Sequence, residues 1–219
     1  MPPAKVPSKR GRGRPVGGGN EPEQAKEALL DAAERSLSKL GFRAATMEAI
    51  AREAGYTRTM MYRHFPSRND LIEALLKRTT LRHVATMFER LGPDVDLATI
   101  IVETTVVVAT EMARDPLFQV FAEKTDRGNV AEMLVNASPF MDFVEPLFVQ
   151  MLQSDATFLR KGIRSGDAAT FLVGTSMSFL LGLVPGSDDA DQVRRYVTTF
   201  ILPAVMASPP KPGAVFSPL

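Results

Sequence analysis

Residues 46–65, with the sequence TMEAIAREAGYTRTMMYRHF, decide the fold of this chain. Thr46 and Thr57 are residues that commonly cap the start of a helix. Gly55 lies between them and tolerates the positive φ that a sharp turn requires. We interpret the stretch as a helix-turn-helix, and the inward residues of its two helices would be Met47, Ile50, Ala51, Met61 and Phe65.

Helical spacing continues on both sides of this stretch. Apolar residues from Ala25 to Leu40 share one face of a helix that Gly41 ends, and Phe42 would follow as a buried anchor. On the other side, Ser67 and Asp70 resemble a capping box. The helix they start would run over residues 68–91, which contain no Pro or Gly. At 1.5 Å per residue it would span roughly 35 Å and connect two domains rigidly.

Every later segment also has helical character. The expected helices cover residues 97–112, 116–124, 140–152, 167–184 and 187–206, and no strand alternation or hairpin signal competes with them. The predicted fold class is therefore all-α. The expected division is a basic arm at 1–20, a three-helix helix-turn-helix domain at 21–66, a helical domain at 67–206 and a Pro-rich tail at 207–219.

Charge divides the chain into two halves although its formal net charge is only +1. Residues 1–90 hold 17 Lys and Arg against 10 Asp and Glu, a net of +7, whereas residues 91–219 hold 9 against 15, a net of −6. The basic half is the candidate for binding a polyanion. The chain has no Cys and no apolar signal-peptide core near its start, so we expect a cytoplasmic protein.

The N-terminal arm has a composition of its own. Residues 1–20 contain five basic residues and four Pro, with little to bury, so the arm should be disordered by itself. Its GRGRP segment resembles the core of an AT-hook, in which Arg12 and Arg14 would lie along a narrow minor groove. The alternative is a basic tail that adds nonspecific affinity through counterion release.

Residues 168–184 carry no charge, which raises the possibility of a membrane span. The segment is shorter than the roughly 20 residues that a span requires, and small polar residues interrupt it. Burial against a second subunit explains it better, with an ordinary intrachain core as the alternative. The residues expected at a homodimer interface are Phe171, Gly174, Ser178, Phe179, Gly182, Leu183, Tyr196, Val197 and Phe200.

Two motifs carry a family resemblance. AREAGYTR at 51–58 and YRHFPSRNDL at 62–71 resemble the DNA-binding region of the TetR family of bacterial repressors, over about residues 25–76. The resemblance implies a phosphate contact at Thr46 and a further one at Arg68. It implies that the front of the recognition helix reads bases and adjacent phosphates, and that its end clamps the backbone. The residues concerned are Tyr56, Thr57, Arg58 and Thr59 at the front and Tyr62, Arg63 and His64 at the end.

Two positions depart from the family pattern. Thr59 replaces a small residue, often Gly, and Met60 stands where a polar residue is common. A Met side chain cannot hydrogen-bond a base edge, but it can pack on a thymine methyl group. We therefore expect an unusual half-site.

The resemblance implies a ligand-responsive transcriptional regulator, with a C-terminal domain for ligand binding and dimerisation. We expect a repressor that binds a palindromic operator as a homodimer and is released by a small hydrophobic molecule. The residues expected to line its pocket are Met87, Phe88, Val107, Phe121, Met141, Phe143, Phe148 and Met151, although Met and Phe at helical spacing are also typical of plain core. Acidic candidates for a cationic ligand are Glu103, Glu111 and Asp142.

Rival functions have less support in the sequence. An enzyme is disfavoured because the two histidines, His64 and His83, have no Cys or acidic cluster near them to complete a metal site. The segment at 174–178 lacks the closing Gly of a nucleophile elbow. We predict no cofactor and no metal. The remaining alternative is an architectural DNA-binding protein without ligand control, which would leave the acidic helical half unexplained.

Overall fold

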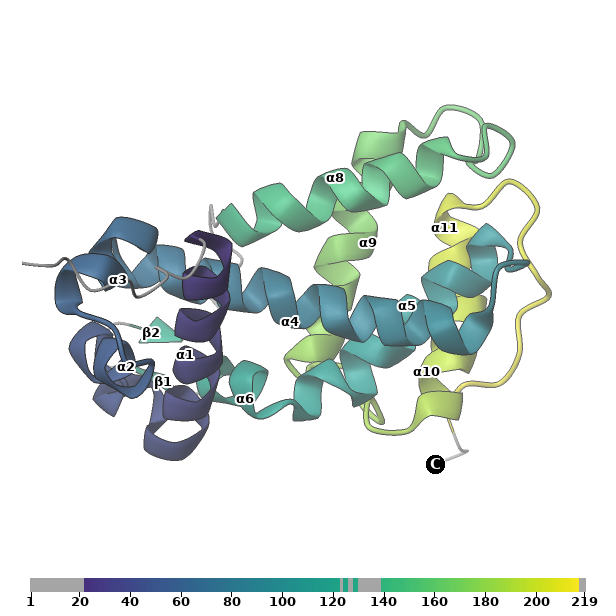
Figure 1. The fold of residues 1–219 in the computed structure, drawn as a ribbon. Helices are drawn as coiled ribbons and strands as arrows, with labels where there is room; N and C mark the ends of the chain where they lie inside the picture. Colours follow the sequence, from purple (N-terminus) through teal and green to yellow (C-terminus); the bar gives the residue numbers. More distant parts are fainter. Residues whose placement is uncertain (1–21, 123, 126–127, 130–138, 217–219) are drawn as a thin grey trace, which may run out of the picture.

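The computed structural model describes residues 22–122, 124–125, 128–129 and 139–216. Over these residues the chain is almost wholly helical, which confirms the all-α prediction (Figure 1). The helices in chain order are α1 (Pro22–Ala44), α2 (Met47–Glu53), α3 (Arg58–His64), α4 (Arg68–Leu91), α5 (Leu97–Thr110), the 3₁₀-helix η1 (Met112–Arg114), α6 (Pro116–Ala122), α8 (Pro139–Gln153), α9 (Ser165–Leu180), α10 (Ala190–Tyr196), the π-helix η2 (Val197–Ile201) and α11 (Leu202–Val205).

The first three helices form a unit around a shared core. Each turns one apolar face inward, and burial of these faces is the main stabilising contribution. Gly55 has a φ of 76°, which permits the sharp turn between α2 and α3. The helix-turn-helix prediction is confirmed, and the expected inward residues are buried: Met47, Ile50, Ala51, Met61 and Phe65.

The end of α1 agrees only partly with the sequence analysis. Gly41 has φ 74° and ψ 172°, outside the helical region, so the helix is interrupted where its end was predicted. The prediction that Leu40 lies on the buried face is wrong, because its side chain is 54% exposed. Phe42 is half-buried against the core and not fully buried.

Helix α4 has the predicted bounds and the predicted cap. The backbone N–H of Asp70 donates to the Ser67 hydroxyl at 3.2 Å, and the N–H of Ser67 donates to the Asp70 carboxylate at 2.8 Å. The helix ends at Gly92, which has a φ of 78°. Leu71 and Leu75 join the core of the first three helices, while Met87 is buried near the other end. Figure 1 shows α4 running from the three-helix unit into the rest of the protein.

The remaining helices pack around α4 and α5. Helix α9 packs against both α8 and α5, and α10 packs against α5. A second core combines residues from α5, α8, the segment after α8, α9 and the last three helices: Leu97, Ile101, Val106, Ala109, Leu152, Phe158, Ala168, Ala169, Leu172, Phe179, Val193, Val197, Ile201, Leu202 and Val205.

A short hairpin follows α6, contrary to the expectation of no strands. The strands β1 (Lys124–Thr125) and β2 (Gly128–Asn129) pair in antiparallel fashion, with Lys124 opposite Asn129. Two residues per strand are too few for an alternating pattern to be visible in the sequence.

The C-terminal helices differ from their predicted bounds. Helix α9 ends at Leu180 and not near residue 184, because the chain adopts a positive φ at Gly182. The single helix expected over residues 187–206 starts only after Asp189, whose carboxylate accepts the N–H groups of Asp191 and Gln192 at 2.8 and 3.2 Å. It then passes through the π-helix η2 before α11.

Packing within the protein accounts for part of the uncharged stretch at 168–184. Ala168, Ala169, Leu172 and Phe179 lie in the second core. None of the helices in the described ranges has the length and hydropathy that crossing a membrane requires.

Ser67→Ala should lower the free energy of unfolding by about 1 kcal/mol, because it removes the cap that starts α4. Urea denaturation measures this change. Ser38→Ala is the matched control, since the Ser38 hydroxyl is exposed and donates only to the Glu34 carbonyl. Equal urea midpoints for the two variants would contradict a stabilising role for the capping box.

Candidate nucleic-acid interface and ligand cavity

The recognition helix α3 has a distinct outer face. Met61 and Phe65 are buried in the core, so the residues between and beside them lie on the side of the helix that faces solvent. Of the predicted contact residues, Thr57, Arg58, Thr59, Tyr62 and Arg63 are exposed, and Tyr56 and His64 are half-buried. Met60 is also half-buried. These side chains share one helix and one edge of the molecule, as a unit that enters a DNA groove would require.

Thr46 and Thr57 cap the two helices of the motif. The Thr46 hydroxyl accepts the N–H of Ala49 at 3.2 Å, and the Thr57 hydroxyl accepts the N–H of Met60 at 3.2 Å. Each hydroxyl therefore keeps its own hydrogen for donation to a phosphate oxygen. Both residues are exposed at a helix start, where backbone N–H groups favour an anion.

Glu48 of α2 lies among the exposed cations of α3, and the sequence analysis missed it. Its Oε1 is 3.2 Å from the Arg58 Nε and accepts the Tyr62 hydroxyl at 3.5 Å. The Arg58 guanidinium also lies 5.4 Å from the centre of the Tyr62 ring. In the protein without DNA, a carboxylate thus holds two residues that were predicted to bind DNA. Glu48 meets Arg58 and Tyr62 only because α2 packs against α3, so the spacing of these residues in the sequence does not predict the contact.

Arg68 has a different environment from the other predicted contact residues. Its guanidinium donates to the Phe42 carbonyl and lies 4.1 Å from the centre of the Phe42 ring. Burial lowers the pKa of Arg68, and its Nε is buried without a hydrogen-bond partner in the described part of the chain. In this conformation Arg68 ties the start of α4 to the end of α1 and does not lie with Arg58 on the outer face. Arg12 and Arg14 fall outside the described residues.

Helix α2 is fixed to α1 by Glu53. Its carboxylate accepts hydrogen bonds from the Ser36 hydroxyl and, at 3.0 Å, from the Arg35 Nε. The bond from Ser36, followed by that from Arg35, lowers the pKa of Glu53. Because Ser36 is buried, the contact positions α2 on α1 and so supports the motif from behind.

Arg78 joins α4 to α1 through three carboxylates. Its guanidinium lies 3.1 Å from Glu27, 2.7 Å from Asp31 and 2.7 Å from Glu34. Burial lowers the pKa of Arg78, but hydrogen bonds with Glu27, Asp31 and Glu34 outweigh burial and raise it overall. Arg82 adds a second link from α4 to Glu34, at 3.0 Å.

The same face of α4 contacts the segment before α6. His83 Nε2 lies 3.0 Å from an Asp115 carboxylate oxygen, and Arg82 lies 3.6 Å from the same oxygen. Arg90 pairs with Glu111 at 2.8 Å. Ion pairs on α4 therefore reach both α1 of the helix-turn-helix unit and the helical domain.

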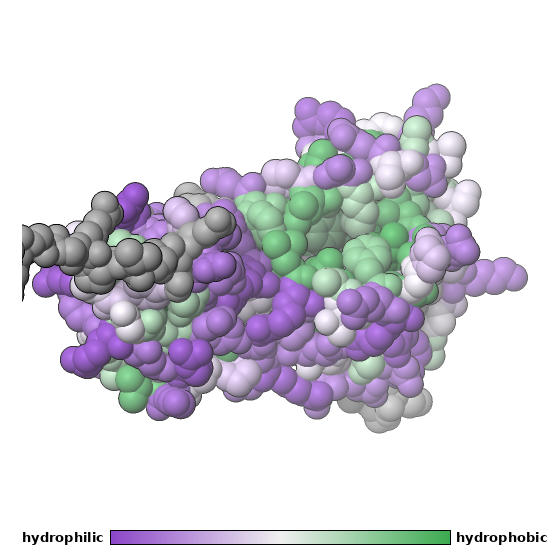
Figure 2. Space-filling view, viewed as in Figure 1, coloured by the Kyte–Doolittle hydropathy of each residue, from purple (hydrophilic) through white to green (hydrophobic). Residues whose placement is uncertain are grey.

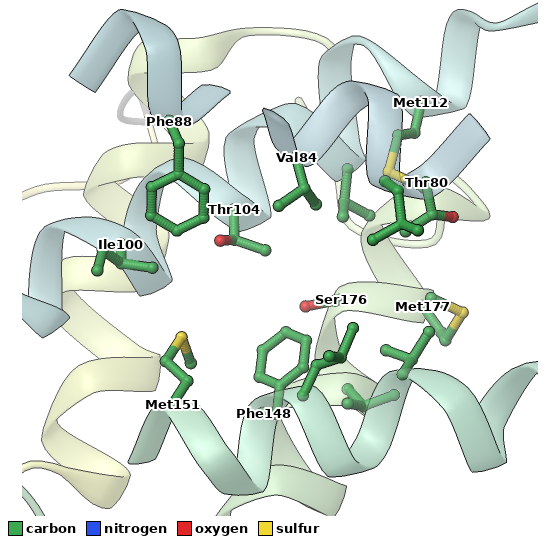
Figure 3. Close-up of a pocket in the computed structure, with 15 residues that line it drawn as sticks. Thr80, Val84, Phe88, Ile100, Thr104, Met112, Phe148, Met151, Ser176 and Met177 are labelled. Atoms are coloured by element: carbon green, nitrogen blue, oxygen red, sulfur yellow. The ribbon is translucent and has the colours of Figure 1, made fainter. Parts of the chain in front are cut away.

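A cavity of about 270 Å³ lies between α4, α5, α8 and α9. Figure 2 shows it as a hydrophobic hollow on the surface, and Figure 3 shows its interior. Of the described residues, none that lines it is charged, and the polar groups on its wall are hydroxyls. The lining residues are Thr80, Leu81, Val84, Phe88, Ile100, Thr104, Val108, Met112, Val144, Leu147, Phe148, Met151, Val173, Ser176 and Met177.

The predicted pocket residues are only partly on this wall. Phe88, Phe148 and Met151 line the cavity, whereas Met87 and Val107 are buried in the first core. Met141 and Phe143 pack on that core, and the Phe121 side chain lies outside the described part of the structure. Of the acidic candidates, Glu103 pairs with Arg194, Glu111 pairs with Arg90, and Asp142 faces solvent. The sequence does not indicate the Thr and Ser residues of the cavity wall, because their spacing is the same as that of hydroxyls that hydrogen-bond within a helix.

Several large aromatic and aliphatic side chains of the C-terminal part of the chain are exposed. Phe171, Leu183, Phe200 and Phe216 are 42%, 70%, 52% and 47% exposed, and we call them the apolar face. The Tyr196 ring lies edge-on to Phe179, Phe200 and Phe216, at centroid distances of 5.3, 5.1 and 6.2 Å. Of the other predicted interface residues, Phe179 and Val197 are buried within the chain, Gly174 and Gly182 are exposed, and Ser178 is half-buried.

The structure combines a helix-turn-helix, whose recognition helix is exposed and cationic, with a helical domain that contains an apolar cavity. Helix α4 joins the two parts. This combination is typical of DNA-binding regulators. The family model described as "Bacterial regulatory proteins, tetR family" matches residues 29–75. Residues 29–75 therefore form a DNA-binding region of the kind found in the TetR family of transcriptional regulators.

Individual relatives agree with this assignment. The chain is 27% identical over 184 residues to the uncharacterized HTH-type transcriptional regulator Rv1255c of Mycobacterium tuberculosis, covering 84% of this chain and 86% of the relative. It is 27% identical over 168 residues to the HTH-type transcriptional repressor BepR of Brucella suis, covering 76% and 79%. The fold is similar to the crystal structure of the TetR family repressor AlkX from Dietzia, with a TM-score of 0.61, 18% identity and coverage of 86% and 99%.

Glu48→Gln should strengthen DNA binding about two- to tenfold at low salt, because it removes a carboxylate that competes with phosphates for Arg58. Arg58→Ala should weaken binding and reduce the salt slope by about one if Arg58 contacts a phosphate. Fluorescence anisotropy on duplexes that the protein selects from random DNA measures both effects. Glu89→Gln is the control, since Glu89 is exposed near the far end of α4. Weaker binding by Glu48→Gln would contradict competition and would indicate a contact from Glu48 to a base.

Proposed function

We propose that this TetR-family regulator is a repressor that binds a palindromic operator as a homodimer and leaves it when a small hydrophobic molecule occupies the cavity. One observation carries the proposal: α4 both anchors the helix-turn-helix unit and forms a wall of the cavity. Leu71 and Leu75 lie in the core of the DNA-binding unit, while Val84 and Phe88 line the cavity. A change in the cavity can therefore affect DNA binding through one continuous helix.

On the DNA side, we propose that α3 enters the major groove. Its front residues would contact bases and neighbouring phosphates, and its last turn would clamp the backbone. The Thr46 hydroxyl would hold a phosphate at the start of α2. The proposed contact residues are Thr46, Tyr56, Thr57, Arg58, Thr59, Tyr62, Arg63 and His64, with Arg68, Arg12 and Arg14 as further phosphate or minor-groove contacts.

Release requires a ligand that prefers the conformation that does not bind DNA. A preference of a few kcal/mol is enough to shift most of the population. Dimeric helix-turn-helix proteins need their recognition helices about 34 Å apart, one turn of DNA. A small tilt of α4 in each protomer would therefore take α3 out of register with the half-sites.

Dimerisation is proposed through the apolar face. Four large apolar side chains of this part of the chain are exposed in a single protomer, and their burial against a partner would be favourable. The face is continuous with the second core through Phe179 and Tyr196, so it is held rigidly. A twofold arrangement would pair the face with its own copy and place two DNA-binding units side by side.

Repression, as opposed to activation, is the proposed sense of control. BepR is a transcriptional repressor and matches most of this chain. A dimer that occupies DNA only without ligand also needs no further surface to act, because bound protein alone blocks access to the operator.

Phe200→Glu should raise the dissociation constant of the dimer at least about tenfold, since it buries a charge in an apolar contact. Analytical ultracentrifugation at micromolar concentration measures it. Leu40→Glu is the matched control, because Leu40 is 54% exposed, close to the 52% of Phe200, but lies on α1. A monomeric native protein, or an unchanged dimer in Phe200→Glu, would contradict the proposed interface.

Arg78→Met should leave the DNA affinity of the ligand-free protein nearly unchanged while reducing the loss of affinity that a cavity ligand causes. The expected reduction is at least about 1 kcal/mol of coupling free energy, because the link from α4 to Glu27, Asp31 and Glu34 is cut. The measurement is DNA affinity with and without ligand. Arg114→Met is the control, since Arg114 is exposed and donates only to the Asp188 carbonyl. An equal response to ligand in the native protein and Arg78→Met would show that coupling runs elsewhere.

A further inference from the structure

The hydroxyl groups of α9 divide into two kinds. Thr170, Thr175 and Ser178 each donate to the carbonyl oxygen four residues earlier in the helix, at 3.1, 2.8 and 3.2 Å. This is the usual way for a helical hydroxyl to satisfy its hydrogen. Ser176, between them, forms no hydrogen bond to another described residue; the residue is only 4% exposed, but its oxygen is not fully enclosed and stays open to the cavity. Figure 3 shows its oxygen directed into the cavity.

The other hydroxyls on the cavity wall are also poorly satisfied. The Thr80 hydroxyl on α4 is buried without a hydrogen-bond partner in the described part of the chain. The Thr104 hydroxyl on α5 has only the weak thioether acceptor of Met87, at 3.7 Å. Its neighbour Thr105, which does not line the cavity, donates to the Ile101 carbonyl at 2.9 Å. Three hydroxyls that lack a strong acceptor among the described residues therefore line one space, and a polar ligand atom there would supply the missing partner. Thr79 on α4 is a further buried hydroxyl that no described residue pairs, but it lies outside the cavity wall.

The remainder of the cavity excludes charge. Apart from these hydroxyls its wall is built from Leu, Val, Ile, Phe and Met side chains. The nearest acid on α5, Glu103, is neutralised by Arg194 at 2.7 Å. A buried carboxylate or ammonium group would have no counter-ion here and would lose its hydration, which is strongly unfavourable.

The apolar mouth of the cavity fixes the direction of a ligand. Leu81, Phe88 and Leu147 line the cavity and are 48%, 41% and 42% exposed, whereas Ser176 is at the buried end. Figure 2 shows the hydrophobic surface that surrounds the opening. A molecule with its polar atom on Ser176 would lay its apolar body between α4 and α8.

We infer that the ligand is an uncharged, mainly apolar molecule with one hydrogen-bonding oxygen at its end, and that Ser176 receives this oxygen. Long-chain alcohols and alkylphenols are of this class. The inference rests on the proposed function for its regulatory meaning, since occupancy of the cavity is the proposed signal. Ser176 is then the residue that selects the ligand, and the apolar wall supplies most of the affinity.

Isothermal titration calorimetry with matched probes tests the inference. The probes are octan-1-ol, 1-chlorooctane, octanoate and octylammonium. We expect octan-1-ol to bind the native protein at least about tenfold more tightly than either ion. Ser176→Ala should weaken octan-1-ol about three- to tenfold and leave 1-chlorooctane unchanged, because only the alcohol loses a hydrogen bond. Thr105→Val, which removes a hydroxyl outside the cavity, should change the affinity for neither octan-1-ol nor 1-chlorooctane.

Three results would overturn the assignment: octanoate or octylammonium binding as tightly as the alcohol, an equal effect of Ser176→Ala on both neutral probes, or no binding of any probe. The comparison of probes on the native protein does not depend on a variant folding. Anisotropy of a selected duplex, measured in parallel, separates this inference from the proposed function. Binding of octan-1-ol without release of DNA would refute the proposed control and support the ligand class. Release of DNA by octanoate or octylammonium, but not by octan-1-ol, would support the proposed control and refute the ligand class.

Discussion

One uninterrupted helix, α4, is the constraint on which the rest of the structure depends. It starts at a capping box, runs through the core of the DNA-binding unit and forms a wall of the cavity. Arg78 ties it to α1 through three carboxylates. If a ligand in the helical domain controls α3, as proposed, α4 is the continuous element that can carry a displacement to it.

The proposed DNA-binding surface holds an acidic residue among its cations. Glu48 contacts Arg58 and Tyr62, two of the proposed DNA contacts, and its carboxylate would compete with phosphates for Arg58. Arg68 is partly buried on Phe42 and stabilises the junction of α1 and α4. In the protein without DNA, two cations of the predicted contact set, Arg58 and Arg68, are therefore already engaged by protein groups.

The sequence was most informative where local physics determines structure. The caps at Thr46, Thr57 and Ser67 and the turn at Gly55 depend on neighbours a few residues away, and the structure has each of them as predicted. The inward residues of the helix-turn-helix followed from helical spacing. Contacts between distant segments could not be predicted: the pairing of Glu48 with Arg58 and of Arg78 with α1 depends on how helices cross. For the same reason the cavity wall was predicted only at Phe88, Phe148 and Met151, and the unpaired hydroxyl of Ser176 was invisible.

The proposed control requires that occupancy of the cavity changes the distance between the DNA-binding units of a dimer. The chain has no Cys, so Ser38→Cys on the exposed side of α1 gives a single site for a spin label. Double electron–electron resonance then measures the distance between the two labels of a dimer. We expect one distance distribution without ligand and a shifted one at saturating octan-1-ol. An unchanged distribution at proven saturation would contradict the proposed control.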